Sequence, residues 1–388
     1  MEKNINIPKG WKEYRLLDIC EVYQPPTIAT KNFVENGKYS VYGANGEIGK
    51  LDRFNHEEPQ VLMACRGASC GAINVSKSFS WINGNAMVVK PNNKVYLSKD
   101  FLKYNLLSIN KASIITGTAQ PQITRQNLKD FKILVCDSTE QSAIVSRIES
   151  SFSRLDSGIA ALQKVQKQLA VYRQAVLKEA FDGCGEKKER LENLSFFITK
   201  GTTPNKTDMS QNSGEIPYIK VYNLTFDLSL DFSITPTFVS KHTHETFLNR
   251  SKVLPGDVLM NIVGPPLGKV SIVPDTYPEW NMNQAIVRFR CKEQLNNKFL
   301  AFYLTFYETV KSMTAKTKAT AGQQNLTLEI CRDITIPVPE IQKQKEIVEH
   351  IESRLSVCDS IEKTVSESLR QAEVLRQSIL KEAFEGRL

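Results

Sequence analysis

Apolar residues recur at every seventh position in two long segments of the chain. The first series is Ile148, Leu155, Leu162, Leu169 and Val176, and the second is Ile351, Cys358, Val365, Ala372 and Ile379. No proline interrupts residues 139–181 or 341–384, and a glycine follows each segment closely. A seven-residue repeat of this kind is typical of a coiled coil, and glycine often follows the end of a helix. We therefore predict two helices of about 40 residues, each roughly 60 Å long.

The two segments are copies of each other. A shift of 203 residues aligns residues 120–183 with residues 323–386 without a gap, and 24 of the 64 positions are identical. The match is densest at the end, where Lys178-Glu179-Ala180-Phe181 recurs as Lys381-Glu382-Ala383-Phe384. The chain is therefore a tandem duplication, in the order globular, helical, globular, helical.

The two long helices are expected to pair with each other. Each is amphipathic, and neither has another partner of its length in the chain. The predicted fold is mixed α/β (α+β), with two globular domains (1–138 and 189–339) separated by two long antiparallel coiled-coil helices (139–188 and 340–388). This arrangement has an internal pseudo-two-fold duplication. The alternative is that each helix is simply a long core helix of its neighbouring domain.

The two globular blocks share an order of signals but little sequence. Each has strand-like runs broken by Gly, Pro and Asn, and each has a tryptophan–asparagine phrase before a strand, at residues 81–88 and 280–287. A helical phrase and a polar loop rich in Thr, Gly and Gln follow in both blocks. Trp81 and Trp280 are expected to be core anchors. The two blocks are therefore expected to share one topology while their surfaces differ.

The composition is that of an ordinary globular protein, with 41% apolar and 24% charged residues. No run of 18 apolar residues indicates a membrane span, and the first residues have no apolar stretch typical of a secretory signal. The eight cysteines form no CxxC pair and the four histidines show no zinc-ligand spacing, so we expect reduced thiols, a cytoplasmic location and no metal site. The net charge of +8 is compatible with nucleic acid without establishing it.

The order of several short phrases, together with the duplication, resembles the specificity (S) subunit of type I restriction-modification systems over essentially the whole chain. These phrases are the two copies of Lys-Glu-Ala-Phe, Gly201-Thr202-Thr203-Pro204, Pro217-Tyr218-Ile219-Lys220-Val221 and Pro255-Gly256-Asp257-Val258-Leu259. The resemblance implies two target recognition domains, each reading one half of a bipartite site in double-stranded DNA. It also implies helical spacers, two docked adenine methyltransferase (M) subunits and, through them, restriction (R) subunits.

Base reading needs polar side chains that bond in pairs, and phosphate anchoring needs Lys, Arg, hydroxyls and backbone amides. Arg66 and Lys269 stand out, because each lies in a glycine-flanked loop after a strand. The candidate DNA contacts of the first block are Tyr42, Asn45, Arg66, Ser69, Asn83, Asn85, Thr118 and Gln120. Those of the second block are Thr202, Thr203, Lys206, Lys220, Asn223, Lys269, Asn283, Lys316, Lys318 and Gln323.

Catalytic motifs are not evident in the sequence. Residues 264–270 imitate a phosphate loop but have three residues between the glycines and no Ser or Thr after Lys269. The Asn/Asp-Pro-Pro-Tyr/Phe motif, with which an adenine methyltransferase holds its flipped base, is missing. We expect no catalytic residue in this chain, and we expect S-adenosylmethionine, ATP and magnesium on its partners. The alternatives are a protein-only coiled-coil scaffold, the specificity subunit of a related type II bipartite-site system, and an enzyme in its own right.

Overall fold

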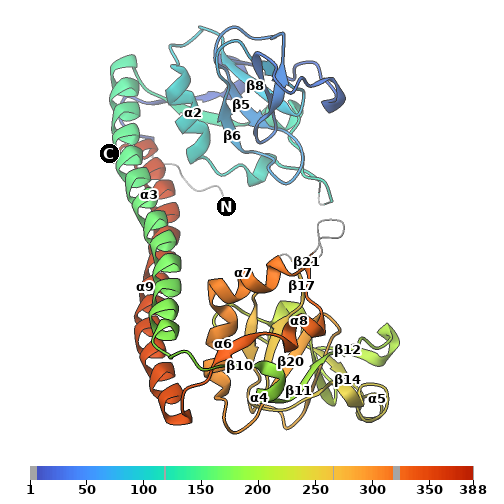
Figure 1. Cartoon of the computed structure of the whole chain (residues 1–388). Coiled ribbons are helices and arrows are strands. Elements are labelled where there is room, and N and C mark those ends of the chain that lie inside the picture. The colour runs from blue at the N-terminus through green and yellow to red at the C-terminus, as the bar shows by residue number, and fades with distance from the viewer. Residues whose placement is uncertain (1–6, 118, 265, 318–323, 388) are drawn as a thin grey trace. The chain divides into compact units, whose positions relative to one another are not determined.

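The computed structural model describes residues 7–117, 119–264, 266–317 and 324–387, which form two compact units (Figure 1). Unit 1 combines residues 1–163 with residues 366–388, and unit 2 comprises residues 164–365. Each unit therefore contains one β-rich domain and a part of each of two long helices, α3 (Ser138–Asp182) and α9 (Ile341–Phe384). These helices cover the residues that the seven-residue repeat predicts.

The domain of unit 1 contains two main sheets. Strands β2, β8, β5 and β6 form an antiparallel sheet in that order, strands β4, β3 and β7 form a second sheet, and β1 pairs with β9. Its strands are β1 (Lys12–Arg15), β2 (Cys20–Tyr23), β3 (Tyr39–Gly43), β4 (Gly46–Leu51), β5 (Val61–Ala64), β6 (Ile73–Val75), β7 (Trp81–Ile82), β8 (Ala86–Pro91) and β9 (Lys132–Val135). Its short helices are α1 (Leu16–Ile19) and α2 (Lys99–Ser108).

The domain of unit 2 repeats this topology. Its sheet β11-β20-β16-β18 corresponds to β2-β8-β5-β6, and the parallel pair β13–β19 corresponds to β3–β7. Its strands are β10 (Lys188–Arg190), β11 (Ser195–Lys200), β12 (Met209–Gln211), β13 (Ile216–Ile219), β14 (Thr237–Val239), β15 (Lys252–Val253), β16 (Val258–Asn261), β17 (Val263–Gly264), β18 (Val270–Ile272), β19 (Trp280–Met282), β20 (Ile286–Cys291), β21 (Gln324–Asn325) and β22 (Thr335–Pro337). Its short helices are α4 (Leu191–Leu194), α5 (Lys241–Glu245), α6 (Asn297–Thr305), α7 (Tyr307–Ala315) and α8 (Leu328–Arg332).

Hydrogen bonds fix how the two domains correspond. The N–H of Asn83 donates to the Tyr42 carbonyl at 2.8 Å, and the N–H of Asn283 donates to the Ile219 carbonyl at 3.0 Å. Asn83 is therefore equivalent to Asn283, and the two tryptophans lie one position apart. Trp280 is a core residue at 1% exposure, whereas Trp81 is half-buried under the Arg53 guanidinium. The expectation of a core anchor is confirmed for Trp280, whereas Trp81 is only partly buried.

The helices pair antiparallel within each unit. In unit 2, Arg173 on α3 binds Asp359 on α9 at 2.6 Å, and Glu179, further along α3, binds Arg354, which lies earlier on α9. In unit 1, Arg376 pairs with Asp156, and these residues are the 203-residue copies of Arg173 and Asp359. Exposed ion pairs of this kind contribute only about 0–1 kcal/mol each, so they set register more than stability.

Apolar burial supplies most of the stabilisation of the seam. The seam positions Ile148, Leu169, Val176, Ile351, Cys358, Val365 and Ala372 are buried, and Leu155, Leu162 and Ile379 are half-buried. Each fully buried aliphatic side chain of this size contributes about 1.5–3 kcal/mol.

The ends of the helices also belong to the domain cores. The first turns of α3 place Ile144 and Ile148 in the core of unit 1. The last turn of α9 places Phe384 in the same core, with its ring 5.2 Å from Phe101. In unit 2 the copy Phe181 lies 5.3 Å from Phe299. The two interpretations of the helices therefore each hold for a part of their length: pairing in the middle, and domain core at the ends.

A buried glutamine ties the start of each helix to its domain. Gln141 has no exposed surface; its Oε1 accepts the N–H of Ser98 at 2.9 Å, and its Nε2 donates to the carbonyls of Tyr96 and Cys136. Its copy Gln344 bonds in the same way to Asn296, Gln294 and Pro339. The same three-bond anchor therefore occurs in both units.

None of the helices in the described ranges is long and apolar enough to cross a membrane.

We predict that Gln141→Ala lowers the free energy of unfolding by about 2–3 kcal/mol, because the substitution leaves buried backbone groups without partners. Urea unfolding followed by tryptophan fluorescence would measure the change. The matched control is Gln163→Ala, at an exposed position of the same helix, which should stay within about 0.5 kcal/mol of the wild type. Equal effects of the two substitutions would contradict the anchor.

Candidate nucleic-acid interface

The loops that carry the candidate residues of unit 1 meet at one edge of its domain. Ala64, the last residue of β5, pairs with Ala86, the first residue of β8, so the loop after β5 adjoins the 83–85 turn. The turn between β3 and β4 joins this edge through the bond from Asn83 to Tyr42. The N–H of Gly67 donates to the Pro121 carbonyl at 3.0 Å, which brings in the 116–122 loop.

Unit 2 has an equivalent edge. Asn261, the last residue of β16, pairs with Ile286, the first residue of β20, and β17 pairs with β21. The N–H of Thr202 donates to the Met282 carbonyl at 3.1 Å, which places the loop after β11 beside the 283–285 turn. We refer to these two loop clusters as the reading edges.

The structure leaves most of the candidate side chains accessible at these edges. Asn45, Arg66, Asn85, Gln120, Thr203, Lys206 and Lys316 are exposed, and Ser69, Thr202, Lys220, Lys269 and Asn283 are half-buried. Thr118, Lys318 and Gln323 lie outside the described residues. The accessible set contains lysine, arginine, amide and hydroxyl groups, which can bind phosphates and base edges.

Burial removes three candidates from this set. Asn83 is 4% exposed, and its amide accepts the N–H of Ile28 at 2.6 Å and donates to the Ile28 carbonyl at 3.0 Å. Asn223 is 1% exposed and donates to the carbonyls of Asp231 and Ile234. Tyr42 is 6% exposed in a small apolar cluster. Their placement contradicts the expectation of DNA contact, because the two amides hold loops together and the tyrosine packs in the core.

Two aromatic side chains at unit 2 were missed by sequence reasoning. Phe226 is 60% exposed, and the Nζ of Lys269 lies 5.7 Å from the centre of its ring. Tyr222 is also exposed, with the Nζ of Lys220 at 5.9 Å. Aromatic faces next to lysines can stack on bases while the cation binds phosphate. No motif marks them: Lys220 and Tyr222 are near neighbours in an ordinary stretch of sequence, and Phe226 and Lys269 come together only in the fold.

Six of the thiols are poorly suited to nucleophilic chemistry. Burial raises the pKa of Cys20, Cys136, Cys291 and Cys331 to about 12, and that of Cys184 to about 11. At the reading edge of unit 1, burial also raises the pKa of Cys65, although Gln24 donates a hydrogen bond to its Sγ. These thiols stay protonated near neutral pH, and the thiolate is the reactive form.

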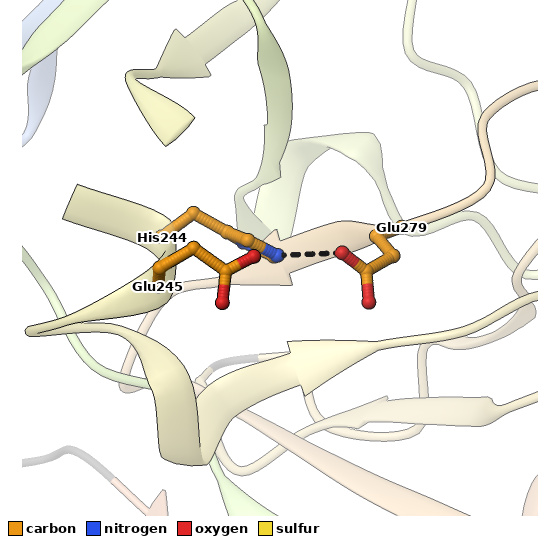
Figure 2. A group of neighbouring side chains, drawn as sticks. All are labelled: His244, Glu245 and Glu279. Carbon is orange, nitrogen blue, oxygen red and sulfur yellow. Dashed lines mark hydrogen bonds and ion pairs between the residues drawn. The ribbon is translucent and has the colours of Figure 1, made fainter. Parts of the chain in front are cut away.

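One cluster in unit 2 has the composition of a metal site. Figure 2 shows His244, Glu245 and Glu279, whose ligand atoms lie within 4.8 Å of one another. The Asn281 amide fixes the histidine tautomer: its Oδ1 accepts the N–H of Met282, so its Nδ2 donates to Nδ1 of His244 at 3.0 Å. Nε2 then carries the ring proton and donates it to Glu279 at 3.2 Å. A metal ion would have to bind the lone pair of Nε2, but this nitrogen carries the ring proton. The cluster therefore fits a structural hydrogen-bond network.

The chain matches one family model twice. The model, described as the type I restriction modification DNA specificity domain, matches residues 8–169 and residues 188–371. The chain is 24% identical to the type I restriction enzyme EcoDI specificity subunit of Escherichia coli, over 98% of this chain and 89% of that protein. It is 22% identical to the EcoKI specificity subunit of Escherichia coli K12, over 97% of this chain and 85% of that protein.

Solved structures share the fold. One, reported for the assembly and conformational transition of the type I R-M system, matches with a TM-score of 0.75 at 17% identity and covers 99% of this chain and 100% of its own. The HsdS subunit from Thermoanaerobacter tengcongensis matches with a TM-score of 0.52 at 18% identity over the full length of both chains.

We predict that Asn83→Ala lowers the free energy of unfolding by about 1–3 kcal/mol, because the Ile28 backbone groups lose their buried partner. Asn85→Ala is the matched control: this neighbour is exposed, and its loss should change stability by less than about 0.5 kcal/mol. Thermal or urea unfolding of the two variants checks the assignment. A fully stable Asn83→Ala chain that binds DNA more weakly would return Asn83 to the contact set.

Proposed function

The chain belongs to the type I restriction-modification DNA specificity family, and we propose that it reads a bipartite, asymmetric DNA site without catalysing a reaction itself. Each recognition domain would read one half-site through its reading edge. The long helices would act as spacers that set the distance between the half-sites.

The observation that carries this proposal is one backbone framework presenting two different sets of side chains. The strand pairing makes Ala64 equivalent to Asn261 and Asn85 equivalent to Ala285. Arg66 lies two positions after Ala64, and Val263 lies two positions after Asn261. Arg66 in unit 1 therefore corresponds to Val263 in unit 2. Because base edges are read by the donor and acceptor pattern of side chains, equivalent edges with different residues suit two different half-sites.

The repeated exposed residues support docking of two identical partners. Val171 is 71% exposed and its copy Val374 is 63% exposed, so packing in this chain does not explain their identity. Lys178 and Glu179 are exposed, as are their copies Lys381 and Glu382. A partner that binds twice needs the same surface twice. We therefore assign each exposed copy to one adenine methyltransferase subunit, which would in turn bind restriction subunits.

A cavity at the same repeat position in each unit also fits equivalent partners. Asp130 and Lys381 line a cavity of about 720 Å³ in unit 1, and their copies Asp333 and Lys178 line one of about 370 Å³ in unit 2. In this proposal, S-adenosylmethionine, ATP and magnesium bind to the partner subunits, and the subunits together perform the chemistry.

We expect methylated adenines in two half-sites separated by a fixed number of unspecified base pairs, when the chain is expressed with its methyltransferase partner. Mapping modified adenines in DNA from those cells, with and without the chain, measures this. A continuous recognition sequence, or methylation that is independent of the chain, would contradict the proposal. Tight S-adenosylmethionine binding by the chain alone would favour an enzyme, and no sequence-dependent retention of DNA by the complex would favour a protein scaffold.

We predict that Val171→Glu removes one docked methyltransferase subunit, Val374→Glu removes the other, and the double variant removes both. A charge buried at an apolar contact should weaken docking at least tenfold, about 1.4 kcal/mol. Native mass spectrometry of the complex counts the subunits. Val357→Glu is the matched control: Val357 is 59% exposed on the same helix pair, but its copy is Arg154, so this position is not repeated. Loss of a subunit in the control would argue against the repeated surface.

A further inference from the structure

A basic cavity lies beside the reading edge of unit 2. It has a volume of about 430 Å³, and its lining includes Phe197, Arg250, Lys252, Glu279, Arg288 and Arg290. The Nε of Arg250 donates to Oγ1 of Thr202 at 3.1 Å, which connects the cavity to the loop that follows β11. None of the four basic residues was among the sequence candidates.

Arg288 is the unusual residue of this cavity. It lies in strand β20 and is only 4% exposed. Its Nη2 donates to Oγ1 of Thr199 at 3.1 Å, and its guanidinium lies 5.5 Å from the centre of the Phe197 ring. Its Nε is buried and has no hydrogen-bond partner. The guanidinium is therefore held in place with donor capacity left unused.

The carboxylates around the cavity are committed to other groups. Both oxygens of Asp257 bind Arg290, at 2.8 and 2.7 Å. Glu245 binds Lys252 at 2.6 Å, and Glu279, itself in the lining, accepts from His244. Within the described part of the chain, Arg288 forms no ion pair with a carboxylate. Burial lowers the pKa of Arg288, as does the nearby Arg290, while Asp257 acts in the opposite direction.

The fold itself does not require an arginine here. In unit 2, Thr199 pairs with Arg288 across β11 and β20, and in unit 1 the equivalent pair is Tyr23 and Val88. Val88 is fully buried, and the Tyr23 hydroxyl bonds to His56 at 2.9 Å. An apolar residue thus occupies the same strand position in the domain of unit 1. A buried guanidinium without a carboxylate is costly, so its presence in unit 2 indicates a ligand that supplies the missing negative charge.

We propose that this cavity binds a phosphate group, with Arg288 as the buried anchor and Arg250 at the exposed side. A planar guanidinium presents parallel N–H donors that match phosphate oxygens. Thr199 accepts a hydrogen bond from Arg288, and Thr202 accepts one from Arg250, so both guanidinium groups are held in place. The acidic side chains around the cavity are already bound to other groups, and the groups left free are N–H donors, so the cavity suits an anion rather than a metal ion.

The position of the cavity favours a phosphodiester of the DNA backbone as the source of that phosphate. This step rests on the proposed function, since it takes the Thr202 loop as part of the reading edge. Phosphate contacts fix the register of a protein on the duplex, so a contact anchored on Thr202 would position its neighbour Thr203 for base reading. Free inorganic phosphate has the same chemistry, and the experiment separates the two sources.

The test compares the full chain with Arg288→Met, which keeps an unbranched stem and removes the charged guanidinium head. Duplex DNA binding is measured as a function of salt, where loss of one phosphate contact lowers the slope of log K against log salt by about 0.9. The ratio of wild-type to variant affinity should then shrink roughly three- to fourfold between 50 and 200 mM salt. In a second arm, the melting temperature is compared in inorganic phosphate and in chloride at equal ionic strength.

Two further variants keep the result interpretable. Arg250→Ala alters an exposed residue of the same cavity and should lower the slope even if Arg288→Met folds poorly. Lys292→Met removes a charge just beyond the other end of β20, away from the reading edge, and should leave the slope unchanged.

A lower slope in Arg288→Met or Arg250→Ala supports a DNA phosphate. A phosphate-dependent rise in melting temperature that Arg288→Met abolishes, without a change in slope, supports the pocket with free phosphate as its ligand. If neither the lower slope nor the phosphate-dependent rise in melting temperature is observed, the proposal is overturned. If neither the wild-type chain nor its complex with the methyltransferase partner binds duplex DNA, the proposed function fails, and the phosphate arm still decides whether the cavity binds an anion.

Discussion

The anchor between each long helix and its domain is the interaction on which the rest of the structure depends. Gln141 and its copy Gln344 are wholly buried and bond to three backbone groups each. In each unit a phenylalanine from the end of the other helix, Phe384 or Phe181, completes the same junction. One domain is therefore held by the start of one helix and the end of the other. Because the glutamine and the phenylalanine are buried, a rotation of the domain against the helix pair would break buried hydrogen bonds and expose apolar surface.

This junction explains which parts of the chain stay alike. The apolar seam positions, the glutamine anchor and the phenylalanine are repeated at an offset of 203 residues, and the glutamine bonds and the core placement of the phenylalanine are equivalent in both units. The reading edges lie at the ends of strands, where side chains can change without loss of core packing. Unit 2 differs from unit 1 in its core as well, because it has the buried Arg288 where unit 1 has Val88. Burying this charge lowers stability, and a bound anionic ligand would offset that loss.

The sequence predicts the architecture well because the helices and their duplication are local, periodic signals. The helix bounds follow from the seven-residue repeat and from the absence of proline. The reading edges are only partly predictable. Asn83 and Asn223 stand in loop-like sequence, but tertiary hydrogen bonds bury them, and such bonds leave no local signature. Arg288 has the opposite problem: it stands among apolar residues of a strand, and only the folded structure shows that it lines a cavity. Gln141 also looks like an ordinary polar residue at a helix start.

The most direct test of two independent readers on one framework is an exchange of residues 189–339 for the corresponding domain of another member of the family. Methylated adenines are then mapped in cells that express the hybrid chain with its methyltransferase partner. The account predicts that one half-site changes, while the other half-site and the distance between them are retained. A change in both half-sites, or an unchanged recognition sequence, would contradict it.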